Sequence, residues 1–595
     1  MLRDTIHRMI LSAVAALHER DVLTIPEGGL PPFDIEHPAK VEHGDFATNI
    51  AMKLIKPPKS RELAQYLADY LNELAESVPA YDLIDKVEVA GPGFINIRLR
   101  STWLLRQARA IITAGPKAGQ SEVGKGTRIN LEFVSANPTG PVHIGNGRGG
   151  FIGDTLGNVL RAAGYDVTKE YYFNDFGQQV NKLGRSTEWY IRQQRGETDL
   201  PKPLDAEGKP IGYFDNADDP EDTYYAGVAR RLVEENPAVL QMFDLPEEER
   251  DVAIGHEAGL VIMSDIKRTM ANLHIEFDVF FNQASLDETG ELQRGIQALR
   301  AGGFLYEKDG ATWMETSRFD DDKDRVIIKA DGETTYIASD VAYALNKLDR
   351  GFDRLIYVLG PDHHGYVARL KATAMMFGYS ADRVHVLLYQ QVNIKVNGES
   401  QRMQKRKGNI VTLDELAELV GSDVTRFFYL MRDNDTHLDF DLALAMKQGD
   451  DNPGLSVQYG HARVAGVVRK AIEAGLNPDQ EAMNANLEVL ASDPPEQRAA
   501  ELALMRELLR LEEVIERAAR NLQPHHLTKY GMDVATAFHI FYDRCPILRA
   551  ENEQVRAARF ALTLAARTIL ARTLTLLGMS APDRMERVQA EVVTE

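Results

Sequence analysis

The stretch SANPTGPVHIGNGRGG, residues 135–150, stands between a run typical of a β-strand and a run typical of a helix. TRINLEF (127–133) precedes it, and FIGDTLGNVLRAAG (151–164) follows it. YDVTKEYYF (165–173) then has the composition of a second strand. Together these runs form a βαβ unit, which predicts a parallel sheet with a right-handed crossover. The sequence therefore predicts an α/β core in which ligands bind at the carboxyl ends of the strands.

The loop and the start of its helix have the chemistry of a phosphate site. Pro138 and Pro141 restrict the loop, and a helix N-terminus offers unpaired N–H groups and partial positive charge to an anion. His143 and Asn146 are three residues apart, so both side chains can face the same anion. The alternative is a tight turn that packs on its own sheet and carries an incidental histidine.

A glycine recurs at every fourth position of this helix, at Gly145, Gly149, Gly153 and Gly157. Glycine inside a helix costs about 1 kcal/mol relative to alanine, so something must approach this face closely. We expect the first glycines of the stripe to face a nucleotide and the later ones to face the sheet.

Two further segments follow strand-like runs later in the chain. RMQKRKGN (402–409) is a basic loop that could offset charge developing in phosphoryl transfer, and its alternative is a solvated turn. VLGPDHHG (358–365) is a strand end at which Asp362 could accept hydrogen bonds from ribose hydroxyls. Its alternative is an Asx turn with a surface histidine pair. No GxxxxGK[ST] motif occurs, so a Walker P-loop is excluded.

The rest of the chain divides by composition, because glycine becomes rare and Ala, Leu, Arg and Glu dominate after Pro453. We predict a Rossmann-like parallel-sheet catalytic core with an insertion, an N-terminal α+β domain and a C-terminal all-α helical bundle. The predicted boundaries are 1–112 for the N-terminal domain, 113–126 for a linker, 127–420 for the catalytic domain with an insertion at about 183–330, 421–453 for a connecting segment and 454–595 for the bundle.

Composition excludes several classes of protein. The 595 residues carry a formal net charge of −21, which argues against non-specific adhesion to nucleic acid but leaves room for a specific RNA partner. Cys545 is the one cysteine, so an internal disulfide and a cysteine-based zinc site are excluded. His363 with His364, and His525 with His526, lack the spacing of metal ligands. The sequence contains no apolar run of membrane-spanning length and no secretory signal, so we expect a cytoplasmic protein.

The three loop segments, in this order, resemble the signatures of class I aminoacyl-tRNA synthetases. HIGN (143–146) resembles their HIGH motif, and RMQKR (402–406) resembles their KMSKS motif. Among these enzymes the chain is most similar to the arginyl-tRNA synthetases, nearly from end to end. The matching segments include GDFATNIAMKL, VAGPGFINIRL, LEFVSANPTGPVHIGNGRG, GYDVTKEYYFND, KADGETTYIASDVAYAL, GPDHHGY, KRKGNIVTLDEL, NPGLSVQYGHARV and LLGMSAPDRM. Asn146 departs from the second His of HIGH, and Arg402 and Gln404 depart from KMSKS.

The resemblance implies a role for individual residues. The catalytic residues, which act on the phosphates, would be His143, Asn146 and Lys405. ATP would be bound by Pro138, Gly140, His143, Gly145, Asn146, Gly360, Asp362, His363, Met403, Lys405 and Arg406. Arginine would be bound by Glu132, Ser135, Asn137, Tyr336, Asp340 and His363. The tRNA would be bound by His461, Arg463 and Arg469 of the bundle.

The resemblance also implies the reaction and its partners. The carboxylate of arginine would attack the α-phosphorus of ATP, pyrophosphate would leave, and a terminal ribose hydroxyl of the tRNA would take the arginyl group. Positioning and electrostatics suffice for both steps, so no protein nucleophile is needed. We expect ATP with Mg²⁺ as a substrate complex, L-arginine and the tRNA for arginine as partners, and a monomer. We expect no tightly bound cofactor, zinc, DNA or membrane.

Three alternatives remain open at this point. A class I synthetase for glutamate, cysteine or an aliphatic amino acid is the first, but a glutamate site should carry basic groups where Glu132 and Asp340 stand. A small nucleotidylyltransferase shares an H-x-G-H turn, yet it needs neither the KRKGN loop nor a long helical C-terminal part. A non-enzymatic RNA-binding relative is the third, and the presence of the basic loop argues against it.

Overall fold

Five parallel strands form the sheet at the centre of the computed structural model, which describes residues 2–175, 177–197, 199–205, 207–214, 223–396, 399–400, 412–449, 451–550 and 552–585. The strand order is β12-β11-β5-β6-β7, and every neighbouring pair is parallel. The bounds are β5 Arg128–Phe133, β6 Asp166–Phe173, β7 Val279–Asn282, β11 Arg354–Leu359 and β12 Val384–Leu388. The predicted α/β core is therefore confirmed, with β5 in the middle of its sheet.

One strand of this sheet was missed by the sequence analysis. β7, with the sequence VFFN, lies inside the stretch 183–330 that was expected to be an insertion, and it pairs with the end of β6. A run of four residues carries too little periodicity to distinguish a strand from part of a buried helix. The chain therefore leaves the sheet after β6, returns for β7 and leaves again before β11.

Helix α5 (Ile144–Ala162) follows β5 and packs its glycine stripe closely against the sheet. A Cβ atom on Gly153 would overlap the ring of Phe133, and one on Gly157 would overlap the side chain of Lys169. The expectation that the later glycines face the sheet is confirmed. Gly149 is also closely packed, because a Cβ atom there would lie 2.8 Å from the ring of Tyr389, just past β12.

A buried group of charges joins α5 to three other parts of the chain. Asp154 of α5 accepts hydrogen bonds from Lys169 of β6 at 2.7 Å and from Arg426 of α14 (Ser422–Leu430) at 2.7 Å. Arg426 also donates to the carbonyls of Leu273, after α8 (Glu247–Asn272), and Leu577, at the end of α21 (Glu553–Leu577). All three charged side chains are at most 2% exposed.

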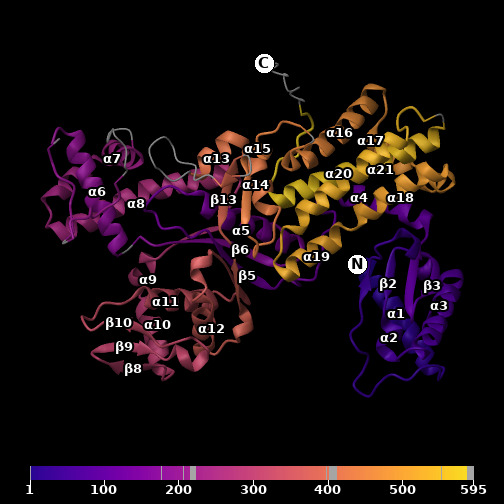
Figure 1. Cartoon of the computed structure of the whole chain (residues 1–595), viewed down its shortest axis with the longest axis horizontal. Helices are drawn as coiled ribbons and strands as arrows, with labels where there is room; N and C mark the ends of the chain where they lie inside the picture. The colour runs from indigo at the N-terminus through magenta and orange to yellow at the C-terminus, as the bar shows by residue number, and fades with distance from the viewer. Residues whose placement is uncertain are drawn as a thin grey trace.

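Most of the remaining helices and strands lie in four groups (Figure 1). Outside these groups are α4 Ser101–Ala114, α13 Leu413–Val420, α14, α15 Leu442–Ala445 and a small sheet of β13 Val392–Val396, β14 Glu399–Ser400 and β15 Leu438–Asp441. One group, at the left of Figure 1, is α6 Gln178–Gln194, α7 Tyr224–Glu235 and α8. A second, below it, is α9 Ala284–Glu288, α10 Glu291–Ala301, β8 Leu305–Lys308, β9 Ala311–Met314, β10 Arg325–Ile328, α11 Tyr336–Asp349 and α12 Tyr366–Met376. A third is the bundle of α16 Pro453–Glu473, α17 Pro478–Asn484, α18 Pro495–Leu509, α19 Leu511–Asn521, α20 His526–Arg544 and α21.

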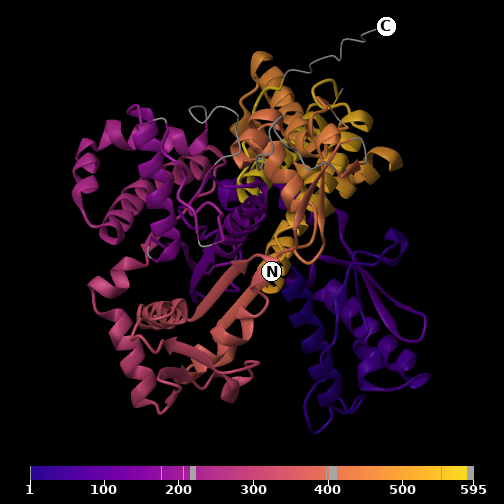
Figure 2. The same cartoon turned by 60° about the vertical axis from the view of Figure 1, so that its left-hand side comes forward.

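The fourth group is the N-terminal part, which stands apart from the sheet and below the bundle in both Figure 1 and Figure 2. Its antiparallel sheet has the order β1-β2-β4-β3 and includes the expected hairpin. The bounds are α1 Leu2–Glu19, β1 Ile35–Glu36, β2 Phe46–Thr48, α2 Ile50–Leu54, α3 Lys59–Ser77, β3 Ile84–Ala90 and β4 Phe94–Leu99. Ion pairs of Asp45 with Arg506 and of His37 with Glu513 join it to the bundle.

Helix α21 is apolar along most of its length. Among the described residues it is the one helix whose length and mean hydropathy would allow it to cross a membrane. Its most apolar window is 67% buried inside the protein, where α16, α18 and α20 pack around it. The composition of α21 is therefore accounted for by its place as the central helix of the bundle.

Replacing Arg426 by Met should destabilise the fold by about 3–5 kcal/mol, because it leaves buried Asp154 short of one cation and frees the carbonyls that Arg426 caps. The midpoint of the first urea-induced unfolding transition measures the effect. Arg520→Met is the matched control, since the exposed Arg520 pairs with Glu516 on the surface and its loss should cost less than about 1 kcal/mol. Equal midpoints for the two variants would contradict the assigned role of the buried group.

Candidate active site

The HIGN segment forms the first turn of α5. His143 is the N-cap residue, and its Nδ1 atom accepts a hydrogen bond of 3.0 Å from the backbone N–H of Gly145. Desolvation of the ring lowers the pKa of His143, which favours the neutral ring that this hydrogen bond requires. With Nδ1 as the acceptor, the proton of the neutral ring lies on Nε2. Nε2–H is therefore available to an anion, whereas the backbone N–H groups of Gly145, Asn146 and Gly147 already donate to His143.

The segment that follows the basic loop is held on this turn. Thr412 forms an antiparallel bridge with His143, and the N–H of Leu413 donates to the carbonyl of Val142 at 2.9 Å. Helix α13 (Leu413–Val420) then begins with a capping box, and Leu413 fills the space left by the missing side chain of Gly147. Three residues with predicted roles in this loop lie outside the described residues, namely Met403, Lys405 and Arg406.

The loop that leaves β5 has a strained backbone. Val134 and Ser135 have φ values of 66° and 40°, a region that β-branched residues rarely adopt. Strain of this kind persists only where the surroundings impose it. Here the Ser135 hydroxyl donates to Glu132 Oε1 at 3.0 Å and accepts from the N–H of Tyr172 at 3.2 Å, and Tyr171 donates to the carbonyl of Ala136. Residues of β6 thus fix the start of the loop between β5 and α5, residues 134–143, which is called the signature loop below.

The same loop is held from outside by the α6–α8 group. The Tyr225 hydroxyl donates to the carbonyl of Thr139 at 2.7 Å, and a Cβ atom on Gly140 would lie 3.0 Å from that hydroxyl. Asn137 donates to the side chain of Gln179 at 2.7 Å. The positions of Asn137, Pro138 and Gly140 therefore depend on helices that lie far along the chain.

A second loop ends at the same edge of the sheet. β11 pairs with β5 in parallel, with Val358 opposite Phe133, so Gly360, Asp362 and His363 follow β11 beside the loop that follows β5. Asp362 and His363 are exposed. A Cβ atom on Gly360 would lie 3.6 Å from the Tyr389 hydroxyl.

The carboxylate of Glu132, at the end of β5, already has a partner inside the protein. Its Oε2 atom accepts a hydrogen bond of 2.5 Å from Nζ of Lys347, a fully buried residue of α11. The Lys347 ammonium lies 4.2 Å from the ring centroids of both Tyr343 and Tyr357. Sequence reasoning missed Lys347, although its spacing of seven residues from Asp340 puts both on one face of α11.

Asp340 differs from Glu132 because part of its carboxylate has no partner. Its Oδ2 atom is buried and accepts no hydrogen bond from the described residues. Burial is the largest of the causes that raise the pKa of Asp340 to about 7, and the charge of Glu132 adds to it. The charges of Arg369 and Lys347 oppose this rise. Tyr336, one turn earlier on α11, is 50% exposed, and its hydroxyl would lie 3.0 Å from a Cβ atom on Gly177.

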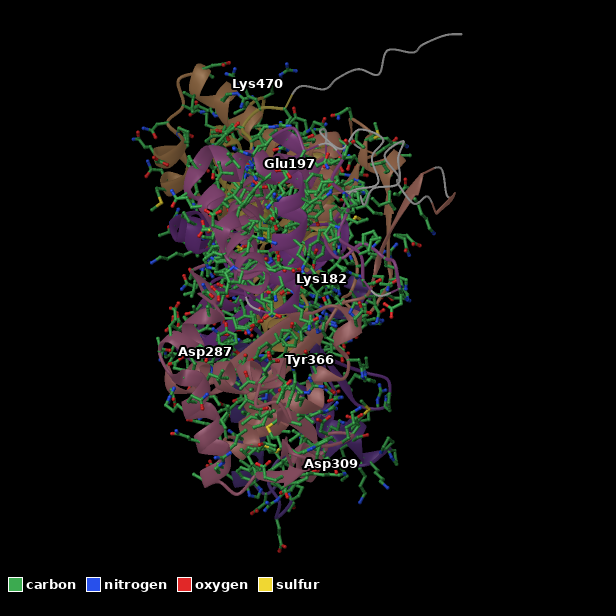
Figure 3. All side chains as sticks on the ribbon, turned by 90° about the vertical axis from the view of Figure 1, so that its left-hand side faces the viewer. Lys182, Glu197, Asp287, Asp309, Tyr366 and Lys470 are labelled. Carbon is green, nitrogen blue, oxygen red and sulfur yellow. The ribbon has the colours of Figure 1, made fainter. Side chains whose placement is uncertain are left out.

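Tyr366, at the start of α12, stands near the middle of the face that Figure 3 shows. It lies there between Lys182 of α6 above it and Asp309 of the β8–β9 turn below it. Burial raises the pKa of Tyr366, and the charge of Asp340 adds to the rise.

The residues expected to contact tRNA lie on α16, but they do not share one environment. Arg463 and Arg469 line a cavity of about 700 Å³ together with His539 and Arg584. His461, in contrast, is 2% exposed, and its Nδ1 atom lies 3.0 Å from the carbonyl oxygen of Pro582. The expectation of a tRNA contact at His461 is corrected, because the segment after α21 covers this side of α16.

Comparisons with known proteins cover nearly the whole chain. Three family models match, described as the arginyl tRNA synthetase N terminal domain at residues 4–99, the catalytic domain of tRNA synthetases class I (R) at 107–438, and the DALR anticodon binding domain at 457–585. An arginine–tRNA ligase of Carboxydothermus hydrogenoformans is 40% identical over 557 residues, 93% of this chain and 94% of the relative. One of Heliobacterium modesticaldum is 39% identical over 587 residues, 98% of this chain and 99% of the relative.

The chain belongs to the arginyl-tRNA synthetase family. The resemblance noted from the sequence and the predicted enzyme class are therefore confirmed, and the other class I synthetases and the nucleotidylyltransferases are set aside. The fold agrees with two solved arginyl-tRNA synthetases. The structure from Thermus thermophilus has a TM-score of 0.72 and 23% identity, and the match covers 98% of this chain and all of the Thermus chain. The structure from Plasmodium falciparum has a TM-score of 0.69 and 13% identity, and the match covers 98% of this chain and 99% of the Plasmodium chain.

An arginyl-tRNA synthetase joins arginine to its tRNA with ATP, and this is the reaction predicted from the sequence. The site of this arginyl-tRNA synthetase must attract a cationic side chain and hold an anionic triphosphate nearby. The structure places Glu132 on β5 and Asp340 on α11, and it places His143 and Asn146 at the first turn of α5.

Binding of arginine to this arginyl-tRNA synthetase should strengthen as the pH rises toward 7 and then level off. Below its pKa of about 7, Asp340 is protonated and cannot pair with a guanidinium, so the Kd should rise about tenfold per pH unit on the acid side. Calorimetric titration with arginine between about pH 5.5 and 8.5, with tRNA present, measures this profile. Asp340→Asn should give a flat profile, and a flat profile in the unchanged enzyme would contradict the assignment.

Proposed function

We propose that arginine is activated at the edge of the sheet where β5 and β11 end, with its side chain in the pocket between α11 and β5. The observation that carries this proposal is the buried Oδ2 atom of Asp340, which has no partner among the described residues and lies near the charge of Glu132. A buried carboxylate is costly unless a cation pairs with it. A guanidinium is always charged and offers a fork of N–H donors, so it is the side chain that suits this pocket.

The phosphates of ATP would lie on the first turn of α5. His143 Nε2–H and the side-chain amide of Asn146 can donate to them, and the positive end of the α5 dipole would attract them. Lys405 and Arg406 would add positive charge from the basic loop. Gly360, Asp362 and His363 would hold the adenosine ribose on the adjacent strand end. In this arrangement the α-phosphorus would face the carboxylate of arginine, as in-line attack requires.

Both steps of the reaction then proceed without a covalent enzyme intermediate. The carboxylate oxygen of arginine forms a bond to the α-phosphorus, and the bond to pyrophosphate breaks. A ribose hydroxyl at the end of the tRNA next attacks the carbonyl carbon of the adenylate, its proton is lost, and AMP leaves. The protein stabilises the charge on the phosphates and holds the reacting atoms in line.

Further partners follow from the same chemistry. Mg²⁺ would arrive with ATP as part of the substrate, since this ion prefers phosphate and water ligands to a cage of protein side chains. Arg463 and Arg469, at the cavity beside α16, would contact the phosphates of the tRNA. We also propose a cytoplasmic monomer, because the net charge of −21 opposes self-association and the single, buried Cys545 suits a reducing compartment.

The experiment that tests the pocket compares arginine with citrulline, in which a neutral urea replaces the guanidinium. Asp340→Asn should raise the Kd for arginine by two to three orders of magnitude, since pairs of buried charges are worth about 3–5 kcal/mol when one partner is lost. The KM for ATP should stay the same, and the preference for arginine over citrulline should shrink. If the preference survives intact, Asp340 holds the α-amino group or lies outside the site.

His143→Ala should lower the rate of arginine-dependent pyrophosphate exchange by about 10²–10³-fold, which is the usual effect of losing one donor to transition-state charge. Asn146→Ala should lower it less, and Asn146→His should retain most of the rate, because an imidazole can replace the amide as a donor. His364→Ala is the control, as His364 is an exposed histidine with no assigned role. Normal rates for both alanine variants at 143 and 146 would mean that neither side chain acts on the phosphates.

A further inference from the structure

A fully buried lysine stands beside the proposed arginine pocket and has no part in the mechanism above. Lys347 lies on α11, with its ammonium between the rings of Tyr343 and Tyr357 and its Nζ atom 2.5 Å from Glu132 Oε2. A buried lysine is rare unless it is paired, and its two aromatic neighbours supply favourable cation–π contacts. The side chain is therefore held in one place by three groups from α11, β11 and β5.

Two ion pairs lie around this lysine. Glu132 pairs with Lys347, and the neighbouring Glu170 of β6 pairs with Arg350 through hydrogen bonds of 2.7 Å and 2.8 Å. Asp340 is the third carboxylate of the group, and its buried Oδ2 atom accepts no hydrogen bond from the described residues. Arg369 is the third cation, and it acts on Asp340 through its charge. Oδ2 of Asp340 is therefore the oxygen of this group that is left for a cationic ligand.

We infer that Lys347 is a positioning residue for arginine recognition: it fixes the carboxylate of Glu132 and offsets its charge, so that Asp340 Oδ2 is the acceptor left to pair with the cationic side chain of the substrate. The inference rests on the proposed arginine pocket. Each oxygen of Glu132 keeps a lone pair when it accepts from Lys347 and Ser135. Glu132 can therefore still accept a hydrogen bond from the substrate at a fixed position.

The same arrangement couples Lys347 to the ionisation of Asp340. The charge of Glu132 raises the pKa of Asp340, whereas the charges of Arg369 and Lys347 lower it. The other titratable groups that interact with Asp340 are tyrosines from the elements packed around it, namely Tyr172 of β6, Tyr357 of β11 and Tyr366 of α12. These tyrosines stay neutral near pH 7, because burial raises the pKa of each above its ordinary value. Glu132 and Lys347 thus act on Asp340 with opposite signs.

The test uses Lys347→Met, which keeps the length of the side chain and removes its charge. Calorimetric titration of the full-length enzyme with arginine, in the presence of tRNA, gives the Kd as a function of pH. For Lys347→Met we expect the midpoint of the profile to move up by about one pH unit, so that arginine binds about tenfold more weakly at pH 7. At about pH 9 the difference from the unchanged enzyme should vanish, and the KM for ATP should be unaltered throughout.

Two more variants keep the test decisive even if Lys347→Met fails to fold. Glu132→Gln leaves the Lys347 charge unopposed, so its midpoint should move toward lower pH, opposite to that of Lys347→Met. The double variant Glu132→Gln/Lys347→Met removes both charges, and its midpoint should return toward that of the unchanged enzyme. A loss of affinity that is equal at every pH, or midpoints of both single variants that move in the same direction, would overturn the role of Lys347. Unchanged arginine binding in Asp340→Asn would instead overturn the pocket itself.

Discussion

The carboxylate of Asp154, buried in the middle of α5, is the point on which the rest of the structure depends. Burial alone would raise its pKa, but Arg426 and Lys169 outweigh that effect, and the pKa of Asp154 is lowered. The charged form is therefore stable only when both cations are in place. Those cations come from β6 and α14, and Arg426 also donates to carbonyls at the ends of α8 and α21. Four parts of the molecule therefore meet at one carboxylate, namely α5, the central sheet, the α6–α8 group and the bundle.

This junction explains why a site made of distant segments has a defined geometry. The first turn of α5 carries the HIGN residues, and Gly259 in the middle of α8 lies near Pro138 of the loop before that turn. Helix α14 follows α13, whose N-cap residue Thr412 forms a bridge with His143. The strained backbone at Val134 and Ser135 also depends on a contact from another strand, because β6 holds the loop at this point. Binding groups are thus set by contacts that form only in the complete fold.

Much of this molecule could be predicted from the sequence, and the failures have physical causes. The βαβ unit and the glycine stripe depend on local periodicity, which the sequence shows directly. Strand β7 depends on a four-residue run that has no periodicity to read. The burial of His461 depends on where the segment after α21 folds back, and the pairing of Lys347 with Glu132 depends on aromatic rings from α11 and β11. Those contacts are long-range, so no local pattern contains them.

The glycine stripe of α5 has a further consequence for how the site responds to its surroundings. Phe133, Lys169 and Tyr389 occupy the places where side chains would otherwise stand, so a shift of the helix by one residue would drive a Cβ-bearing position into them. The register of α5 on the sheet is therefore fixed by steric exclusion, which dissolved ions do not weaken. Salt should weaken the binding of tRNA, but the spacing between the first turn of α5 and the carboxylates of Glu132 and Asp340 should be the same in dilute and in concentrated electrolyte.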